Sequence, residues 1–191
     1  MWTRESLVAH LSAGNSLLGG SAPEPPADYL LFWGHTPKDP ARVDASCLSQ
    51  WFPRAFELDG VRYETAEHFM MAEKARLFRD AEALARVLAC KTPAEAKKIG
   101  REVRNFEPDA WGKARSEAVV RGNVGKFGAH DDLRTFLLGT KEKVLVEASP
   151  RDRIWGIGMG KSNPDALVPA RWRGLNLLGF ALMEARARLR A

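Results

Sequence analysis

The chain has 191 residues, of which 45% are hydrophobic and 28% are charged, and this composition suits one soluble domain with a substantial core. No run of about 18 apolar residues occurs, so we expect a cytoplasmic protein with no membrane span and no membrane partner. The net charge of +5 fits a phosphorylated substrate or a polyanionic partner. Because the basic residues form no block, we favour solvated faces over a nucleic-acid groove.

The cysteines and histidines show no metal-binding or disulfide pattern. Cys47 and Cys90 stand far apart without a Cys-x-x-Cys motif, and the four histidines are scattered. This spacing argues against a structural zinc site and against a disulfide framework. We expect no metal and no cofactor.

The first 28 residues are predicted to be an N-terminal extension and linker. Apolar residues fall on one side of a short helix over residues 5–13. Residues 19–28 are rich in Gly, Pro and Ser, which is typical of a linker. The domain proper is therefore expected at residues 29–191.

A few short strands are predicted within this domain. Residues 29–33 are a short apolar run, and residues 144–146 are a second strand candidate. Between residues 56 and 63, two runs flank Asp59-Gly60, a pair that favours a type I′ turn. This segment therefore predicts a β-hairpin.

Helical patterns fill most of the remaining chain. Thr92-Pro93-Ala94-Glu95 has the spacing of a capping box, with proline at the first helical position. Helices are expected at about residues 65–78, 80–90, from 92 onward, 113–126, 131–138 and 177–189. The predicted fold class is α+β, a compact and mostly helical single domain with a few short strands that include the hairpin.

Glu67 is the first candidate for chemistry. If Thr65 caps the following helix, Glu67 lies in its first turn, where free N–H groups and the helix dipole favour the ionised carboxylate. An ionised Glu67 would suit a base, a nucleophile or a cation stabiliser better than a proton donor. Acidic residues are common in first turns, however, so position alone favours an ordinary structural role.

The segment from Asp152 to Gly158 is the second candidate. Asp152 lies between two arginines, and alone it is best interpreted as a surface residue paired with its neighbours. Trp155 precedes two glycines, so it could stack on a flat base or be a core residue in a glycine turn. The glycine spacing at 156–160 does not match a dinucleotide-binding loop, and no Gly-x-Ser-x-Gly motif occurs.

Other polar side chains leave two interpretations open. Lys74 lies on the same helix face as Glu67, and Lys126 ends the helix predicted at 113–126. Lysines on such helices are usually solvated, and a phosphate contact is the minority interpretation. Asn176 could cap the last helix or hydrogen-bond a ligand.

Short motifs follow one another in the order found in a known family. They are Phe32-Trp33-Gly34; Leu48-Ser49-Gln50-Trp51-Phe52; the hairpin from Phe56 to Tyr63; Thr65-Ala66-Glu67-His68-Phe69 through Lys74-Ala75; Thr92-Pro93 through Ala96-Lys97-Lys98-Ile99-Gly100-Arg101; Trp111; Lys126-Phe127; Leu133-Arg134 with Leu137-Leu138; Leu145-Val146-Glu147-Ala148-Ser149; Asp152 through Ile154-Trp155-Gly156-Ile157-Gly158; and Asn176-Leu177-Leu178-Gly179 through Leu182-Met183. Over about residues 30–190, the chain resembles the NADAR, or YbiA-like, family.

The resemblance implies an N-glycosidase that cleaves the bond between a ribose anomeric carbon and a nitrogen. Some members act on ribosylamino-pyrimidine phosphates of early riboflavin biosynthesis and release ribose 5-phosphate, which is the activity expected here. Others remove ADP-ribose from guanine in nucleic acid, an antitoxin-like activity that we keep as the alternative. A third alternative is a non-catalytic module that binds ADP-ribose or nucleotides. The expected partner is thus a phosphorylated ribosyl or ADP-ribosyl substrate, or ADP-ribosylated nucleic acid.

The resemblance also implies the site residues. The family's catalytic glutamate falls on Glu67, and its aspartate and tryptophan fall on Asp152 and Trp155. Glu67 would stabilise an oxocarbenium-like transition state or activate water, with Asp152 as the second carboxylate. Substrate contacts are expected from Phe32, Trp33, Ser49, Lys74, Trp111, Lys126, Gly156 and Asn176.

Overall fold

The computed structural model describes residues 1–16 and 28–191, and over these residues the chain forms seven α-helices and four short strands. The predicted linker at 19–28 lies outside the described residues, apart from Asp28. The elements are α1 (Arg4–Ser16), β1 (Tyr29–Phe32), η1 (Ala45–Leu48), β2 (Phe56–Leu58), β3 (Val61–Tyr63), α2 (Ala66–Leu77), α3 (Ala81–Ala89), α4 (Pro93–Arg101), α5 (Pro108–Gly128), α6 (Asp131–Gly139), β4 (Val144–Glu147), η2 (Pro164–Leu167), η3 (Pro169–Arg171) and α7 (Leu177–Arg190).

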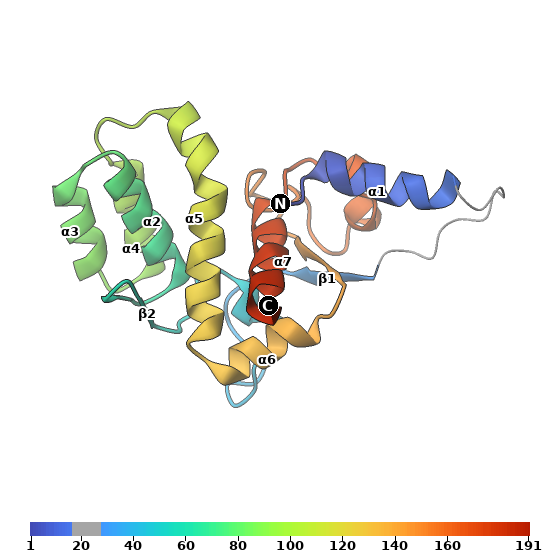
Figure 1. Ribbon diagram of the computed structural model, residues 1–191, viewed down its shortest axis with the longest axis horizontal. Coiled ribbons are helices and arrows are strands. Elements are labelled where there is room, and N and C mark those ends of the chain that lie inside the picture. The colour runs from blue at the N-terminus through green and yellow to red at the C-terminus, as the bar shows by residue number, and fades with distance from the viewer. Residues whose placement is uncertain (17–27) are drawn as a thin grey trace.

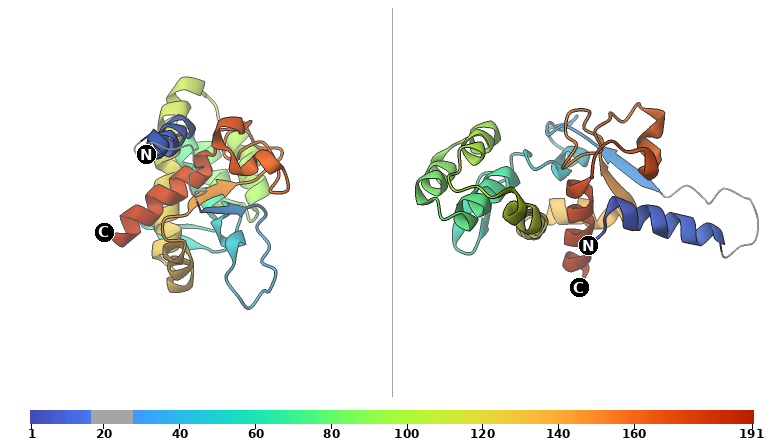
Figure 2. Two further views of the ribbon diagram at one scale, coloured as in Figure 1. Left: turned by 90° about the vertical axis from the view of Figure 1, so that its right-hand side faces the viewer. Right: turned by 90° about the horizontal axis from the view of Figure 1, so that it is seen from above.

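Two long helices form the middle of the molecule. α5 packs along α7, and α2 packs against α3, α4 and α5 on one side (Figure 1). The strands β1 and β4, together with α1, lie on the other side of α7, as the view from above also shows (Figure 2). The predicted α+β class, mostly helical with few strands, is confirmed. None of the described helices combines the length and apolar character needed to cross a membrane.

β1 and β4 form a parallel pair although they are far apart in the sequence. Tyr29 lies opposite Val144 and Phe32 opposite Glu147. The pairing continues past the strand ends, where the Ala148 N–H donates to the Phe32 carbonyl at 2.8 Å. Since parallel strands end at the same edge, the residues that follow β1 and β4 meet there.

Local sequence signals set the entry to α2. Asp59 and Gly60 have φ of 54° and 72°, as the predicted type I′ turn between β2 and β3 requires. The hairpin brings Tyr63 edge-on to Phe69 of α2, with ring centroids 5.0 Å apart. Thr65 then caps α2, since its side chain accepts from the His68 N–H.

The other helix starts follow the sequence with one exception. The capping box at Thr92 and Glu95 opens α4 as predicted. The predicted start of α5 at residue 113 is wrong, because the helix begins at Pro108. Proline fits the first helical turn, where its missing N–H has no helical partner to lose. Trp111 therefore lies within α5.

The N-terminal helix joins the same core. Leu7 of α1 is only 2% exposed, and Arg4 donates to the Trp172 carbonyl at 3.1 Å. α1 thus packs against the segment around η3.

A bridge between β4 and α7 explains Asn176. This residue has a φ of 55°; its Oδ1 accepts from the Glu147 N–H, and its Nδ2 donates to the Leu145 carbonyl, both at 2.9 Å. It is fully buried and makes no capping hydrogen bond from its side chain. Asn176 stands at the N-cap position of α7, but its side chain does not cap the helix, because its amide joins the strand to the helix. The buried amide is committed to these two bonds, which argues against the predicted substrate contact.

Gly179 permits this close approach, because a Cβ there would overlap the Leu145 carbonyl oxygen. Replacing Gly179 by Ala should lower the free energy of unfolding by roughly 3 kcal/mol, since backbone stands in the way. Gly112 of α5 is the matched control, as nothing lies within 4 Å of its Cβ position. Gly112→Ala should raise stability by about 0.5–1 kcal/mol. Urea denaturation measures both, and equal effects would contradict this account of the β4–α7 contact.

Candidate active site

Glu67 lies in the first turn of α2 and is buried, with 3% of its surface exposed. Its backbone N–H donates to the Gln50 carbonyl at 3.0 Å, which ties α2 to the segment after η1. Its carboxylate oxygen Oε1 is buried and has no hydrogen-bond partner among the described residues. A buried carboxyl with an unused oxygen is costly to fold, so its surroundings decide its charge.

Burial raises the pKa of Glu67 to about 7. The positive charge of Lys97 opposes this most strongly, followed by hydrogen bonding from the Trp51 side chain; Asp152 raises the pKa, and Arg101 lowers it. The prediction that Glu67 is ionised at rest is therefore wrong, because desolvation outweighs the helix N-terminus. Near neutral pH both protonation states are populated.

Trp51 and Ser49 belong to a segment whose backbone is bound by a lysine of α5. Lys126 of α5 is fully buried, and its Nζ donates to the Cys47 carbonyl at 2.6 Å and to the Ser49 carbonyl at 2.9 Å. The predicted phosphate contact of Lys126 is thus wrong, because the ammonium is committed to these carbonyls. Lys97 of α4 faces the same segment, with its Nζ over the Trp51 ring at 5.7 Å from the ring centroid.

Glu147, the last residue of β4, brings a further carboxyl to the same place. Its Oε2 is buried without a hydrogen-bond partner among the described residues. Burial raises its pKa to about 8; Asp152 and Glu67 add to this, and Lys97 opposes it. Glu147 belongs to one of the family motifs, but it was not among the predicted site residues. The available signal was an acidic residue directly after the strand predicted at residues 144–146.

Asp152 organises the loop that follows β4. Its Oδ1 accepts from the backbone N–H groups of Ile154 and Trp155, both at 2.8 Å, and its own N–H donates to Ser149 Oγ. Oδ2 takes no part in these bonds. The loop turns back to the strand, where the Ile157 N–H donates to the Glu147 carbonyl at 2.9 Å.

Gly156 is required by this turn. A Cβ there would lie 2.8 Å from the Glu147 carbonyl oxygen and 3.1 Å from that of Asp152. Gly156 is buried and lines neither cavity described below, so its predicted substrate contact is wrong; it makes room for backbone. Trp155, the preceding residue, is partly exposed.

Two adjoining cavities surround these groups. The polar cavity has a volume of about 720 Å³ and is lined by Trp33, Gly34, His35, Thr36, Ser49, Trp51, Lys97, Arg101, Glu147, Ser149, Arg151 and Asp152. The aromatic cavity has a volume of about 340 Å³ and is lined by Glu67, Met70, Met71, Lys74, Lys97, Gly100, Arg101, Phe106, Pro108, Trp111, Arg115, Ile154 and Trp155. Because Lys97 and Arg101 line both, α4 forms a wall that the two cavities share.

A sequence model of the NADAR domain matches residues 31–190. The chain belongs to the NADAR family. It is 41% identical over 163 residues to an N-glycosidase of Acanthamoeba polyphaga mimivirus, covering 83% of this chain and 94% of that protein. It is 32% identical over 145 residues to an N-glycosidase of Nostoc punctiforme, covering 75% of this chain and 85% of that protein.

The fold leads to the same family. The NMR structure of YbiA from Escherichia coli matches with a TM-score of 0.68 at 26% identity, covering 86% of each chain. The predicted family is confirmed, and this NADAR domain is an N-glycosidase, a hydrolase of N-glycosyl bonds. The alternative of a non-catalytic binding module is therefore set aside.

The NADAR fold brings together some of the predicted site residues and leaves others apart. Glu67, Lys74, Trp111 and Trp155 line the aromatic cavity, and Trp33, Ser49 and Asp152 line the polar one. The predicted substrate contact of Phe32 is wrong, because its ring is buried in the core and lines neither cavity. Trp51, Lys97, Arg101 and Glu147 were missed, since only the fold places them beside Glu67.

Lys74 has a partner of its own within the aromatic cavity. Its Nζ donates to the Gly100 carbonyl at 2.6 Å and lies 4.0 Å from the Phe106 ring centroid. A phosphate contact from Lys74 stays a prediction. Among residues 1–16 and 28–191, no group of three or more His, Cys, Asp or Glu side chains could hold a metal ion.

The raised pKa of Glu67 gives a stability prediction with a definite sign. The folded-state pKa of about 7 is above the ordinary value of 4.5, so wild-type stability is lost as pH rises through this window. Gln at position 67 does not ionise. The free energy of unfolding of Glu67→Gln, relative to wild type, should therefore increase by about 3 kcal/mol from about pH 4 to about pH 9.

Urea denaturation across this pH range measures the difference. The control is Glu117→Gln, because hydrogen bonding from Arg188 lowers the pKa of Glu117. Its stability relative to wild type should move in the opposite direction over the same range. A pH-independent difference for Glu67→Gln would contradict the buried, shifted carboxyl.

Proposed function

We propose that this N-glycosidase hydrolyses the ribose–nitrogen bond of a ribosylamino-pyrimidine phosphate and releases ribose 5-phosphate. The observation that carries the proposal is the Glu67 carboxyl, which is buried at the wall of a cavity with one oxygen unused. Such a group is available to the reacting atoms and has no structural hydrogen bond at Oε1 to lose.

The two cavities suit the two ends of a nucleotide-like substrate. Lys97, Arg101 and Arg151 give the polar cavity its positive charges, which would hold the sugar phosphate. Phe106, Trp111 and Trp155 line the aromatic cavity, which would take the flat pyrimidine. The anomeric carbon would then lie where the cavities adjoin, beside Glu67.

Glu67 and Glu147 have complementary roles in this proposal. As the C–N bond breaks, the ribose gains positive charge, which an ionised Glu67 stabilises while it takes a proton from the attacking water. With its pKa at about 8, Glu147 is mostly protonated at neutral pH, so it can donate a proton to the leaving nitrogen. Pairs of carboxyls held at different pKa values commonly divide acid and base work in this way.

Lys97 and Asp152 assist these two groups. Lys97 keeps Glu67 ionisable by opposing the desolvation of its carboxyl. Asp152 fixes the loop that carries Trp155 through Oδ1, and its Oδ2 is available for a ribose hydroxyl. No step in this scheme needs a metal.

The polar cavity also supports the second candidate, removal of ADP-ribose from guanine. Its volume of about 720 Å³ exceeds what a ribose phosphate needs. Trp33 is 62% exposed at this cavity, and the His35 and Trp51 rings lie 5.7 Å apart, which together offer a stacking surface for an adenine. A basic cavity mouth would then meet the nucleic acid.

Product release from Glu67→Gln tests the proposed function. The variant should keep its fold and lose roughly 100- to 10,000-fold in kcat/KM on the true substrate. Wild type, Glu67→Gln and Glu117→Gln are incubated with a ribosylamino-pyrimidine phosphate and with an oligonucleotide carrying ADP-ribosylated guanine, and the released sugar is detected by mass spectrometry. If wild type cleaves only the oligonucleotide, the second candidate function is established. If Glu67→Gln is fully active, the proposed catalytic role of Glu67 is excluded.

The acid role of Glu147 has a separate test. Glu147→Gln should lose most of its activity on the substrate with the natural nitrogen leaving group. Wild-type activity should fall above about pH 8 as Glu147 ionises, and this fall should be absent in the variant. A 4-nitrophenyl riboside 5-phosphate needs no proton on its leaving group, so the variant should cleave it at close to the wild-type rate. Equal losses on both substrates would show that Glu147 acts otherwise than as an acid.

A further inference from the structure

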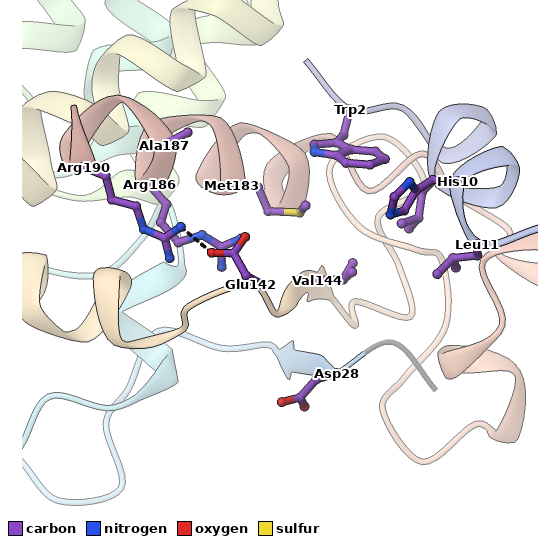
Figure 3. A pocket seen from close by; sticks show the side chains of 11 residues that line it. Trp2, His10, Leu11, Asp28, Glu142, Val144, Met183, Arg186, Ala187 and Arg190 are labelled. Carbon is purple, nitrogen blue, oxygen red and sulfur yellow. Dashed lines mark hydrogen bonds and ion pairs between the residues drawn. The ribbon is translucent and has the colours of Figure 1, made fainter. Parts of the chain in front are cut away.

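A separate cavity of about 320 Å³ lies at the opposite end of the β1–β4 pair from the active site. Val144, the first residue of β4, lines this cavity, whereas Glu147, the last residue of β4, lines the polar cavity of the active site. Its other walls come from α1 and from the C-terminal half of α7 (Figure 3). The two cavities share no lining residue.

Arg186 is the unusual group in this cavity, because it is a buried cation, with 4% of its surface exposed. Its Nη1 donates to Thr140 Oγ1 at 2.7 Å and to the Lys143 carbonyl at 3.0 Å, which are neutral acceptors. Within residues 1–16 and 28–191, no carboxylate lies within 4 Å of its guanidinium. Buried arginines are normally paired with an anion, so the absence of a direct ion pair at Arg186 is unusual.

The carboxylates that line the cavity are already used. Glu142 pairs with Arg190 at 2.6 Å, and Asp28 pairs with Lys143 at 3.1 Å. Burial lowers the pKa of Arg186, repulsion from Arg190 lowers it further, and the negative charge of Glu142 opposes both. Among the described residues, Arg186 therefore has no direct ion pair at the cavity wall.

The far end of the cavity is aromatic. Trp2 and His10 meet edge to face, with ring centroids 5.2 Å apart, and Figure 3 shows them across the cavity from Arg186, Arg190 and Glu142. The buried side chains of Leu7 and Met183 add apolar surface. A ligand that fills this space needs a flat ring at one end and a negative group at the other.

We propose that this cavity binds a flat aromatic anion, with its carboxylate or phosphate on Arg186 and its ring against Trp2. The proposal is independent of the N-glycosidase site and of its substrate. Arg186 also donates hydrogen bonds to Thr140 and Lys143, so replacing it would disturb the fold. The test therefore leaves Arg186 in place and changes the aromatic end and the volume of the cavity.

Isothermal titration calorimetry with indole-3-acetate and the neutral indole-3-acetamide tests the proposal on the whole chain. Indole-3-acetate should bind at one saturable site, and the amide should bind at least tenfold more weakly. Trp2→Ala removes the stacking ring, and Met183→Trp fills the space; each should weaken indole-3-acetate at least tenfold. Leu88→Ala, an exposed apolar position on α3, is the matched control and should bind as wild type does.

The catalytic cavity provides the other control. Trp155→Ala removes its aromatic wall and should leave indole-3-acetate binding unchanged. Three results would each overturn the proposal: no saturable binding, equal affinity for acid and amide, or binding that survives Trp2→Ala and Met183→Trp. Binding that is lost in Trp155→Ala would place the ligand in the active site and would equally overturn it.

Discussion

The burial of the Glu67 carboxyl is the constraint on which the proposed active site depends. Taking this group out of water raises its pKa to about 7, and its Oε1 is left without a partner among the described residues. The charge of Lys97 and a hydrogen bond from Trp51 oppose this cost, so the carboxyl can still ionise near neutral pH. This balance keeps the pKa of Glu67 near neutral, whereas a fully solvated or fully ion-paired carboxylate would have a much lower pKa.

The rest of the fold holds the groups that maintain this balance. The buried Lys126 binds the carbonyls of the segment that carries Trp51, and Asn176 binds the backbone at the end of β4 beside Glu147. Gly156 lets the Asp152 loop close against that strand. Residues that resembled substrate contacts therefore position the residues that do line the cavities, which explains why they occur in the same motifs.

The sequence predicted what local chemistry decides. The Asp59-Gly60 turn, the Thr92 capping box and the helix that starts after Thr65 follow from short-range patterns, and the structure confirms them. The ionisation of Glu67 could not be read in this way, because first-turn position favours the anion while tertiary burial does the opposite. Lys97 and Glu147 gave no local signal of their approach to Glu67, since long-range packing of α4 and the parallel pairing of β1 with β4 place them there.

The pH dependence of kcat/KM in wild type and Lys97→Met tests the central claim most directly. In wild type, activity should rise with pH as Glu67 ionises, with a midpoint at about 7. Without the Lys97 charge this midpoint should move to higher pH, whereas Lys98→Met, the change at the exposed neighbouring lysine, should leave it in place. An acid limb that stays at the same pH in Lys97→Met, or moves to lower pH, would contradict the account.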